Sequence, residues 1–318
     1  MNTTLGMQNR LPNKEFRQLV SFLKEEKIYK DKKPRGINWK EYTLQQINEA
    51  KELLLFIKNS VDKCKYPLKK VGRPLTDPKV LAKAILICEA LDLTERKAQG
   101  WLEIIGPFVG IHEKLDDRVI GEAYDKPEVA YVLKQVFDKA KTSNGILMGD
   151  GTGLETSRKQ NYESSKDKKA GGYMVNVVDS REVVQAFSIS GIQECKIMLK
   201  LIEEVDGDSL RLDAGFVSKE LTIKIEELGM LPYIFPRKNI NINGRPAWKL
   251  MYLELFYDII AWLEEYYQRV HCESFYSSFK RVFGIVSKVR FSCRLTQVTA
   301  RIILHNFRRL SYFNRLKG

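Results

Sequence analysis

Short apolar runs in the middle of the chain constrain the fold most, because their order specifies one kind of sheet. GILMGD (145–150), GGYMVNVVDS (171–180) and VVQAFSIS (183–190) follow one another without an intervening helix, which predicts that three strands form a meander. SLRLDAGF (209–216) and MLPYIFP (230–236) come later, each after a segment with helical periodicity. The sequence therefore predicts an α/β fold in which helices cover a mixed sheet.

The residues before the first strand have a helical pattern. Pro78 follows Asp77, as is typical of a first helical position, and Gly106-Pro107 is expected to end a helix that Thr94 caps. The two helices on either side of Asp92-Leu93 form either a helix-turn-helix that reads DNA or an ordinary helical hairpin. Helices are expected at 14–27, 43–61, 78–91, 95–105, 127–141, 194–205, 218–228, 252–288 and 295–310.

These patterns predict two domains. The first is a helical N-terminal region at 1–141, with basic linkers near 31–37 and 66–77. The second is a domain at 142–318 that contains the sheet and ends in a basic helix. A chain of 318 residues is long enough for two domains of ordinary size.

The charge and the cysteine pattern limit the classes of function. There are 53 Lys and Arg against 40 Asp and Glu, and the net charge of +13 favours nucleic acid or another polyanion as a partner. The first residues contain no apolar core of a signal peptide, and no apolar run is long enough to span a membrane. Five scattered cysteines without CxxC spacing indicate a reducing, cytoplasmic compartment and exclude a zinc finger.

Two acidic residues stand at the ends of predicted strands. Asp150 is followed by Gly151, and Asp213 comes two residues before Gly215, so each could be an ordinary turn residue. If the first and fourth strands are neighbours, however, both carboxylates lie at one edge of the sheet, where a bound cation would relieve their repulsion.

A third acid, Glu273, lies in the segment YYQRVHCESFYSSFKRVF (266–283). On an ideal helix Tyr266, Arg269, Glu273 and Lys280 fall on one narrow stripe, opposite an aromatic face. This predicts a helix that packs on the sheet and presents a phenol, a guanidinium, a carboxylate and an ammonium group. A solvated face with ion pairs one turn apart remains the alternative.

The same four residues resemble a known signature. Y-x2-R-x3-E-x6-K is typical of the insertion-sequence DDE transposases of the IS-four-like superfamily, and it occurs here without deviation. GDGTGLETS (149–157) and LDAGF (212–216) are similar to the segments that carry the first and second Asp of that family. GRPLTDP and the helices after it (72–105) are similar to the N-terminal regions of many such transposases.

The resemblance implies a ribonuclease H-like catalytic domain behind an all-α DNA-binding region. It implies cleavage at transposon ends and strand transfer into target DNA, with two Mg²⁺ (or Mn²⁺) ions, in a synaptic complex that contains a homodimer. Terminal inverted repeats and target DNA would be the partners, in the cytoplasm at the nucleoid. Asp150, Asp213 and Glu273 would be the catalytic metal ligands, Arg269 and Lys280 would hold phosphates, and Tyr266 would position the DNA backbone.

Further residues are weaker candidates for DNA contacts. KKVGRP (69–74), which contains Arg73, and KDKKPRG (30–36) resemble minor-groove hooks, although charged linkers are the alternative. The C-terminal arginines could clamp DNA or form a packing helix with a basic face. Asp213 and Glu273 are 60 positions apart, which leaves room only for a loop at 237–251 between the predicted strand and the helix. Trp248 lies in this loop, and packing is its favoured role. A hairpin intermediate is therefore not implied.

Two other classes of function remain open at this stage. A DNA-binding regulator derived from a transposase would bind DNA without catalysis. A ribonuclease H-like nuclease would share the acids but would not require the Tyr-Arg-Glu-Lys row.

Overall fold

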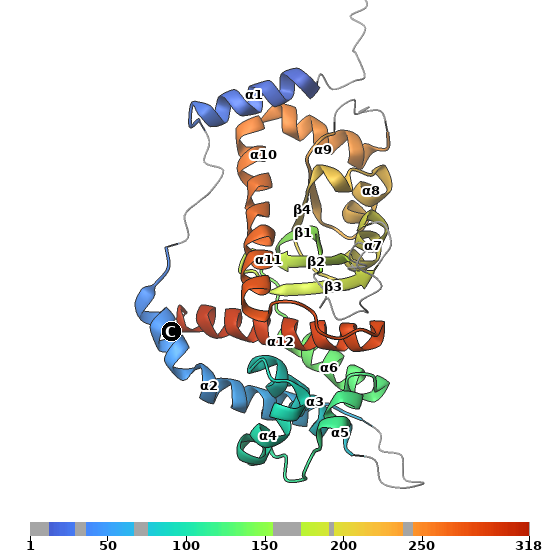
Figure 1. The fold of residues 1–318 in the computed structure, drawn as a ribbon. Helices are drawn as coiled ribbons and strands as arrows, with labels where there is room; N and C mark the ends of the chain where they lie inside the picture. The colour runs from blue at the N-terminus through green and yellow to red at the C-terminus, as the bar shows by residue number, and fades with distance from the viewer. Residues whose placement is uncertain are drawn as a thin grey trace, which may run out of the picture. The chain divides into compact units, whose positions relative to one another are not determined.

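The structure is a computed structural model that describes residues 13–28, 36–66, 76–154, 173–190, 194–237 and 244–317. Contacts between Cα atoms divide the chain into two compact units (Figure 1). Met1–Arg35, Ser143–Thr152 and Tyr173–Tyr276 form the first, here called the sheet unit. Gly36–Thr142, Gly153–Gly172 and Ser277–Gly318 form the second, here called the helical unit.

The sheet has five strands in the order β3-β2-β1-β4-β5. Strands β2 and β3 pair antiparallel, whereas β4 pairs in parallel with both β1 and β5. This mixed order confirms the predicted ribonuclease H-like α/β sheet, including the adjacency of the first and fourth strands. The strands are β1 (Ile146–Gly153), β2 (Tyr173–Asp179), β3 (Val184–Ser190), β4 (Ser209–Leu212) and β5 (Leu231–Ile234).

Helices of the sheet unit cover the sheet with apolar side chains. Trp248 of α9 is one of these apolar side chains. It is 2 % exposed, lies in the core and makes an edge contact with Tyr252. The packing role favoured for Trp248 is therefore confirmed, and the predicted loop contains a helix. The helices are α1 (Asn13–Glu25), α7 (Glu194–Leu201), α8 (Lys219–Glu227), α9 (Pro246–Tyr257), α10 (Ile259–Tyr266) and the first half of α11 (Val270–Phe283).

The helical unit is built around α3, whose residues are almost all buried. The C-terminal helix α12 packs on α2, α3 and α6, so segments from both ends of this unit share one core. Its helices are α2 (Trp39–Asp62), α3 (Pro78–Ala90), α4 (Glu95–Val109), α5 (Asp117–Ala123), α6 (Pro127–Ala140) and α12 (Phe291–Arg315).

Several helices differ from the sequence-based expectation, and α12, for example, begins at Phe291 rather than at residue 295. Helix α2 begins at Trp39 because Asn38, not Thr43, accepts the capping hydrogen bond from an N–H in the first turn. Helix α4 continues through Pro107 and ends at Gly110, whose φ of 78° is a left-handed conformation suited to glycine. The short helix α5 was not predicted, although Asp116 caps it.

Several of the C-terminal arginines form ion pairs within the helical unit. Arg301 is buried and donates to Glu89 at 2.7 Å, and Arg308 donates to Glu49 at the same distance. Arg290 pairs with Asp125. These contacts favour the packing interpretation of the basic C-terminal segment over a DNA clamp.

Helix α4, the candidate recognition helix, has an apolar exposed face. Trp101, Ile104 and Phe108 are 46 %, 67 % and 68 % exposed. Base edges in the major groove are read mainly by side chains with hydrogen-bonding groups. This face therefore favours an ordinary helical hairpin at α3 and α4.

The buried Glu89 carboxylate yields a test of the helical unit. It accepts hydrogen bonds from Tyr124, Gln297 and Arg301, so replacing it by alanine leaves a buried guanidinium without its partner. We expect Glu89→Ala to lower the free energy of unfolding by about 3–5 kcal/mol, measured by chemical denaturation. Glu122→Ala, which breaks an exposed pair with Arg118, should cost less than about 1 kcal/mol. Equal effects of the two changes would contradict this account.

Candidate active site

Strand register places two carboxylates side by side in the sheet unit. Gly149 of β1 lies opposite Leu212 of β4 in a parallel pair, so Asp150 and Asp213 are the next residues along their strands. Asp213 follows the end of β4 and accepts from the N–H of Gly215 at 2.6 Å at the start of a 3₁₀ turn, as its predicted turn role requires. Asp150 accepts from the N–H of Gly151 at 2.9 Å, but both residues lie inside β1, which continues to Gly153 instead of ending at Asp150 as predicted. The two acids are therefore neighbours on adjacent strands, and only Asp213 has a turn role.

Arg269 links the first Asp to the acid on the helix. Its Nη1 atom is 3.4 Å from Oδ2 of Asp150, and its Nη2 atom is 2.6 Å from Oε1 of Glu273. The Asp150 and Arg269 side chains are only 19 % and 21 % exposed, whereas that of Glu273 is 54 % exposed. The guanidinium therefore acts as the counter-charge between a buried and an exposed carboxylate.

The electrostatics place all three acids in one neighbourhood. The pKa of Asp150 is raised to about 6, mainly by burial; the negative charges of Asp213 and Glu273 also contribute to the rise, while the Gly151 N–H and Arg269 oppose it. Burial acts to lower the pKa of Arg269, but Tyr266 and the three acids outweigh it and raise that pKa. The charge of Arg269 thus interacts with all three candidate acids.

The predicted stripe of four residues is interrupted. Helix α10 ends at Tyr266, a turn of 3₁₀ helix covers Tyr267–Arg269, and α11 begins at Val270. Tyr266 is 6 % exposed and stacks on Trp262 with ring centroids 5.3 Å apart, so its phenol does not lie on a solvated row with the other residues. Burial raises the pKa of Tyr266 to about 12.

The aromatic face of α11 is confirmed in part. Phe275, Phe279 and Val286 are buried as expected, whereas Val282 is 51 % exposed. Lys280 is exposed, two turns along α11 from Glu273, in the part of the helix that belongs to the helical unit.

A buried arginine of β4 fixes the end of α10. Arg211 of β4 is 1 % exposed; it donates to the main-chain oxygen of Glu265 at 2.8 Å and pairs with the Glu265 carboxylate. Its guanidinium also lies 5.0 Å from the centre of the Tyr233 ring. The strand that leads to Asp213 is therefore tied to the residue just before the Tyr-Arg-Glu-Lys segment.

Sequence reasoning also missed a polar contact behind Asp150. The hydroxyl of Tyr276 on α11 lies 2.6 Å from the main-chain oxygen of Asp150 and contacts Oδ1 of Asn176 on β2. Cys272, one turn earlier on α11, is 3.8 Å from the same Asn176 oxygen. The available signal was the single Asn in the otherwise apolar run YMVNVV, because a buried amide requires a polar partner.

A further acid lies close to the strand end. A methyl group added to Gly151 would come within 2.5 Å of the carboxylate of Glu194, at the start of α7. Arg237 donates to the main-chain oxygens of Ala214 and Gly215, immediately after Asp213. The acid Glu194 and the cation Arg237 thus lie near the two aspartates, although neither belongs to the sequence motifs that contain them.

The donor set suits a divalent metal ion in its chemistry. Carboxylate oxygens are the hard ligands that Mg²⁺ prefers, and the negative charges of Asp213 and Glu273 act on Asp150 together with the opposing charge of Arg269. In the part of the chain that the structure describes, no three His, Cys, Asp or Glu side chains already lie close enough to hold a metal ion. Binding would therefore require that the carboxylates turn away from Arg269.

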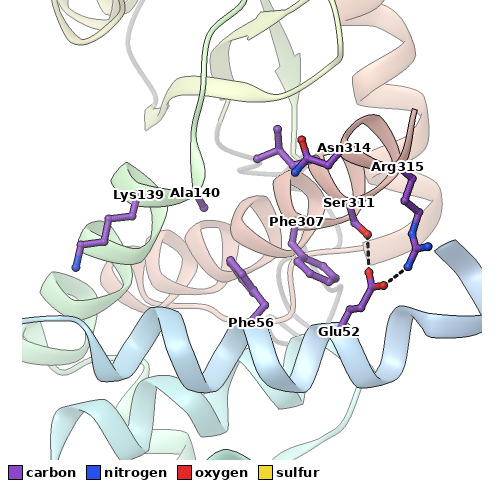
Figure 2. A pocket seen from close by; sticks show the side chains of 9 residues that line it. Glu52, Phe56, Lys139, Ala140, Phe307, Ser311, Asn314 and Arg315 are labelled. Carbon is purple, nitrogen blue, oxygen red and sulfur yellow. Dashed lines mark hydrogen bonds and ion pairs between the residues drawn. The ribbon is translucent and has the colours of Figure 1, made fainter. Parts of the chain in front are cut away.

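Other candidates lie elsewhere. Arg73 and both predicted minor-groove hooks fall outside the described residues. A hollow of about 540 Å³ in the helical unit lies between α2 and α12, where Glu52 accepts from Ser311 and Arg315 (Figure 2). Its lining contains none of the predicted site residues. Among the described helices, none combines the length and apolar composition needed to cross a membrane.

The raised pKa of Asp150 predicts that this residue destabilises the metal-free protein. Its folded-state pKa of about 6 exceeds the ordinary 3.8, so stability is lost as pH rises from about 4 to 6 and the carboxyl ionises. We expect Asp150→Asn to raise the free energy of unfolding by about 1–2 kcal/mol at neutral pH, with no gain at acid pH where both states are protonated.

This prediction is tested by urea denaturation in a chelating buffer at several pH values. Asp206→Asn, at an exposed position of the same unit, is the matched control and should change stability little at any pH. A lower stability of Asp150→Asn than of the wild type at neutral pH would rule out an electrostatic cost at Asp150.

A comparison of the sequence with protein families identifies the family of this chain. No curated protein matches this sequence. Among solved structures, a piggyBac transposase in a synaptic complex with hairpin DNA is similar with a TM-score of 0.39 and 9 % identity, over 84 % of this chain and 72 % of that one. That likeness is too low to support a conclusion. The sequence profile of the family described as "Transposase DDE domain" matches residues 142–306, more than half of the chain and all three candidate acids, and the protein therefore belongs to the DDE transposase family.

Proposed function

We propose that this protein is an active DNA transposase that cuts the ends of a mobile element and joins them to target DNA. The observation that carries the proposal is the meeting of Asp150, Arg269 and Glu273 beside Asp213, just beyond the last paired residues of the parallel strands β1 and β4. Membership of the transposase family supports the same reaction class. The reaction is phosphoryl transfer, in which water and then a DNA 3′-hydroxyl attack a backbone phosphate.

Asp150, Asp213 and Glu273 are the proposed metal ligands. Two Mg²⁺ or Mn²⁺ ions, when bound, activate the attacking oxygen and stabilise the leaving oxygen. The chain supplies three carboxylates of different exposure, from the well-buried Asp150 to the exposed Glu273. Asp150 is thus held in place by the sheet, while the exposed side chain of Glu273 can adjust its position when DNA binds.

Arg269 is the proposed phosphate-binding residue of the centre. Its guanidinium already contacts two of the acids, so it is within reach of a phosphate that approaches the same ligands. Guanidinium groups bind phosphate through paired N–H donors. The arginine would exchange its carboxylate contacts for phosphate contacts when metal and DNA enter. Lys280 and Arg73 are proposed as further phosphate contacts, and Tyr266 as the packing support of Arg269.

DNA is the proposed partner, both as terminal inverted repeats and as target. The net charge of +13 supports binding to a polyanion. We place the protein in the cytoplasm at the nucleoid, and we propose a homodimer when two ends are brought together. The helical region at 1–141 is the proposed end-binding region, and 142–318 the catalytic domain.

A strand-transfer assay with labelled terminal repeats of the flanking element tests the proposal. Products joined to target DNA support a transposase, simple nicking supports a nuclease, and binding without any Mg²⁺-dependent product supports a regulator. We expect Asp150→Asn, Asp213→Asn and Glu273→Gln each to lower cleavage at least a thousandfold, with end binding retained in a gel-shift assay. A fully active variant would remove that residue from the proposed ligand set.

Arg269 yields a second prediction. Arg269→Ala should lower the rate of end cleavage about a hundredfold, because a cation that offsets charge on the transferring phosphate is lost. Arg269→Lys should recover only part of the rate, since a lysine cannot form the paired contacts.

Arg118→Ala is the matched control for Arg269→Ala. Arg118 also pairs with a glutamate one helical turn away, but at an exposed position of the helical unit. It should change cleavage less than twofold. If Arg118→Ala reduces cleavage as much as Arg269→Ala does, the phosphate role of Arg269 is wrong.

A further inference from the structure

Tyr276 joins the two elements that carry Asp150 and Glu273. It lies on α11, one turn beyond Glu273, and its ring is buried. Its hydroxyl is 2.6 Å from the main-chain oxygen of Asp150 and 3.4 Å from that of Met174 on β2. Both strands and this part of α11 belong to the sheet unit, so the contacts lie within one compact body.

The phenol has one proton and several acceptors around it. The Asp150 oxygen is at a good donor distance, whereas Met174 is at the limit. Asn176 also contacts the phenol through Oδ1, while its Nδ2 has no partner among the described residues. With the amide turned so that Nδ2 faces the phenol, Asn176 donates to Tyr276 and leaves the phenol proton to Asp150.

The hydrogen bond from Tyr276 to Asp150 differs from the ion pairs of the site in the oxygen atom that it uses. Arg269 holds Asp150 and Glu273 through their side chains, and those oxygens are the ones that a metal ion would use. Tyr276 holds Asp150 through its main-chain oxygen, which leaves both carboxylate oxygens available. The link therefore persists when the carboxylates change partners.

We propose that Tyr276 is a positioning residue that fixes the spacing between Asp150 and Glu273 through its hydrogen bond to the Asp150 main chain. The inference rests on the proposed metal-dependent function. Its physical basis is that two ligands on separate elements bind a shared ion tightly only if their backbones are held in place. The phenol oxygen, rather than the ring, performs this task, because phenylalanine would fill the same space.

The experiment titrates full-length protein with Mn²⁺ and follows bound ion by the loss of the free-ion electron paramagnetic resonance signal. End cleavage is measured over the same Mn²⁺ range. Tyr276→Phe should raise the half-saturating Mn²⁺ concentration about fivefold or more in the binding titration, as expected for one lost hydrogen bond. Cleavage should show the same shift, with end binding unchanged.

Two control variants separate positioning from general weakening of the core. Tyr252→Phe removes another buried hydroxyl of the same unit, one without a hydrogen-bond partner among the described residues, and should leave Mn²⁺ binding unchanged. Asn176→Ala lowers stability by opening a cavity at a fully buried position but keeps the bond from Tyr276 to Asp150. It should shift Mn²⁺ binding less than twofold.

Each outcome decides a separate point. Unchanged Mn²⁺ binding in Tyr276→Phe overturns the inference, and so does an equal shift in Asn176→Ala. If wild-type protein binds Mn²⁺ in a manner lost in Asp150→Asn but cleaves no ends, the proposed function fails while the binding titration still judges Tyr276. If Asp150→Asn leaves Mn²⁺ binding unchanged, no ion binds at Asp150 and both proposals are wrong.

Discussion

The parallel pairing of β1 with β4 is the constraint on which the candidate site depends. Because Gly149 lies opposite Leu212, the next residue on each strand is an aspartate, and the two carboxylates meet without any loop to bring them together. A shift of one residue in this register would turn one aspartate to the other face of the sheet. The buried leucines on both strands prevent such a shift, so the apolar core also sets the positions of the two aspartates.

The third acid lies on α11, and each of these strands is bound to one of the successive helices α10 and α11. Arg211 of β4 binds the end of α10, and Tyr276 of α11 binds Asp150 within β1. The 3₁₀ turn between the two helices brings Arg269 between Asp150 and Glu273. Burial of like charges opposes folding, as the raised pKa of Asp150 indicates, and this cost is typical of sites that favour activity over stability.

Much of the fold followed from sequence pattern, and the reasons for the failures are physical. Strand order and the adjacency of the two acids could be predicted because apolar runs mark the strands, although β1 continues past Asp150 and Gly151 to Gly153. The burial of Arg211 and Tyr266 could not, because both depend on partners far along the chain, namely Glu265 for the first and Phe235 for the second. Helical periodicity also assumes an unbroken helix, and it therefore overlooked the 3₁₀ turn before Glu273.

Because α12 shares a core with the N-terminal helices of its unit, the two units can complete folding at different times during synthesis. The helical unit needs α2, α3 and α6 from the first half of the chain and α12 from its last part, with the Ser143–Thr152 and Tyr173–Tyr276 segments of the sheet unit synthesised between them. Glu89 therefore lacks its partner Arg301 while most of the chain is being made. During translation the sheet unit can fold first, whereas the helices that precede it remain incomplete until α12 has emerged from the ribosome.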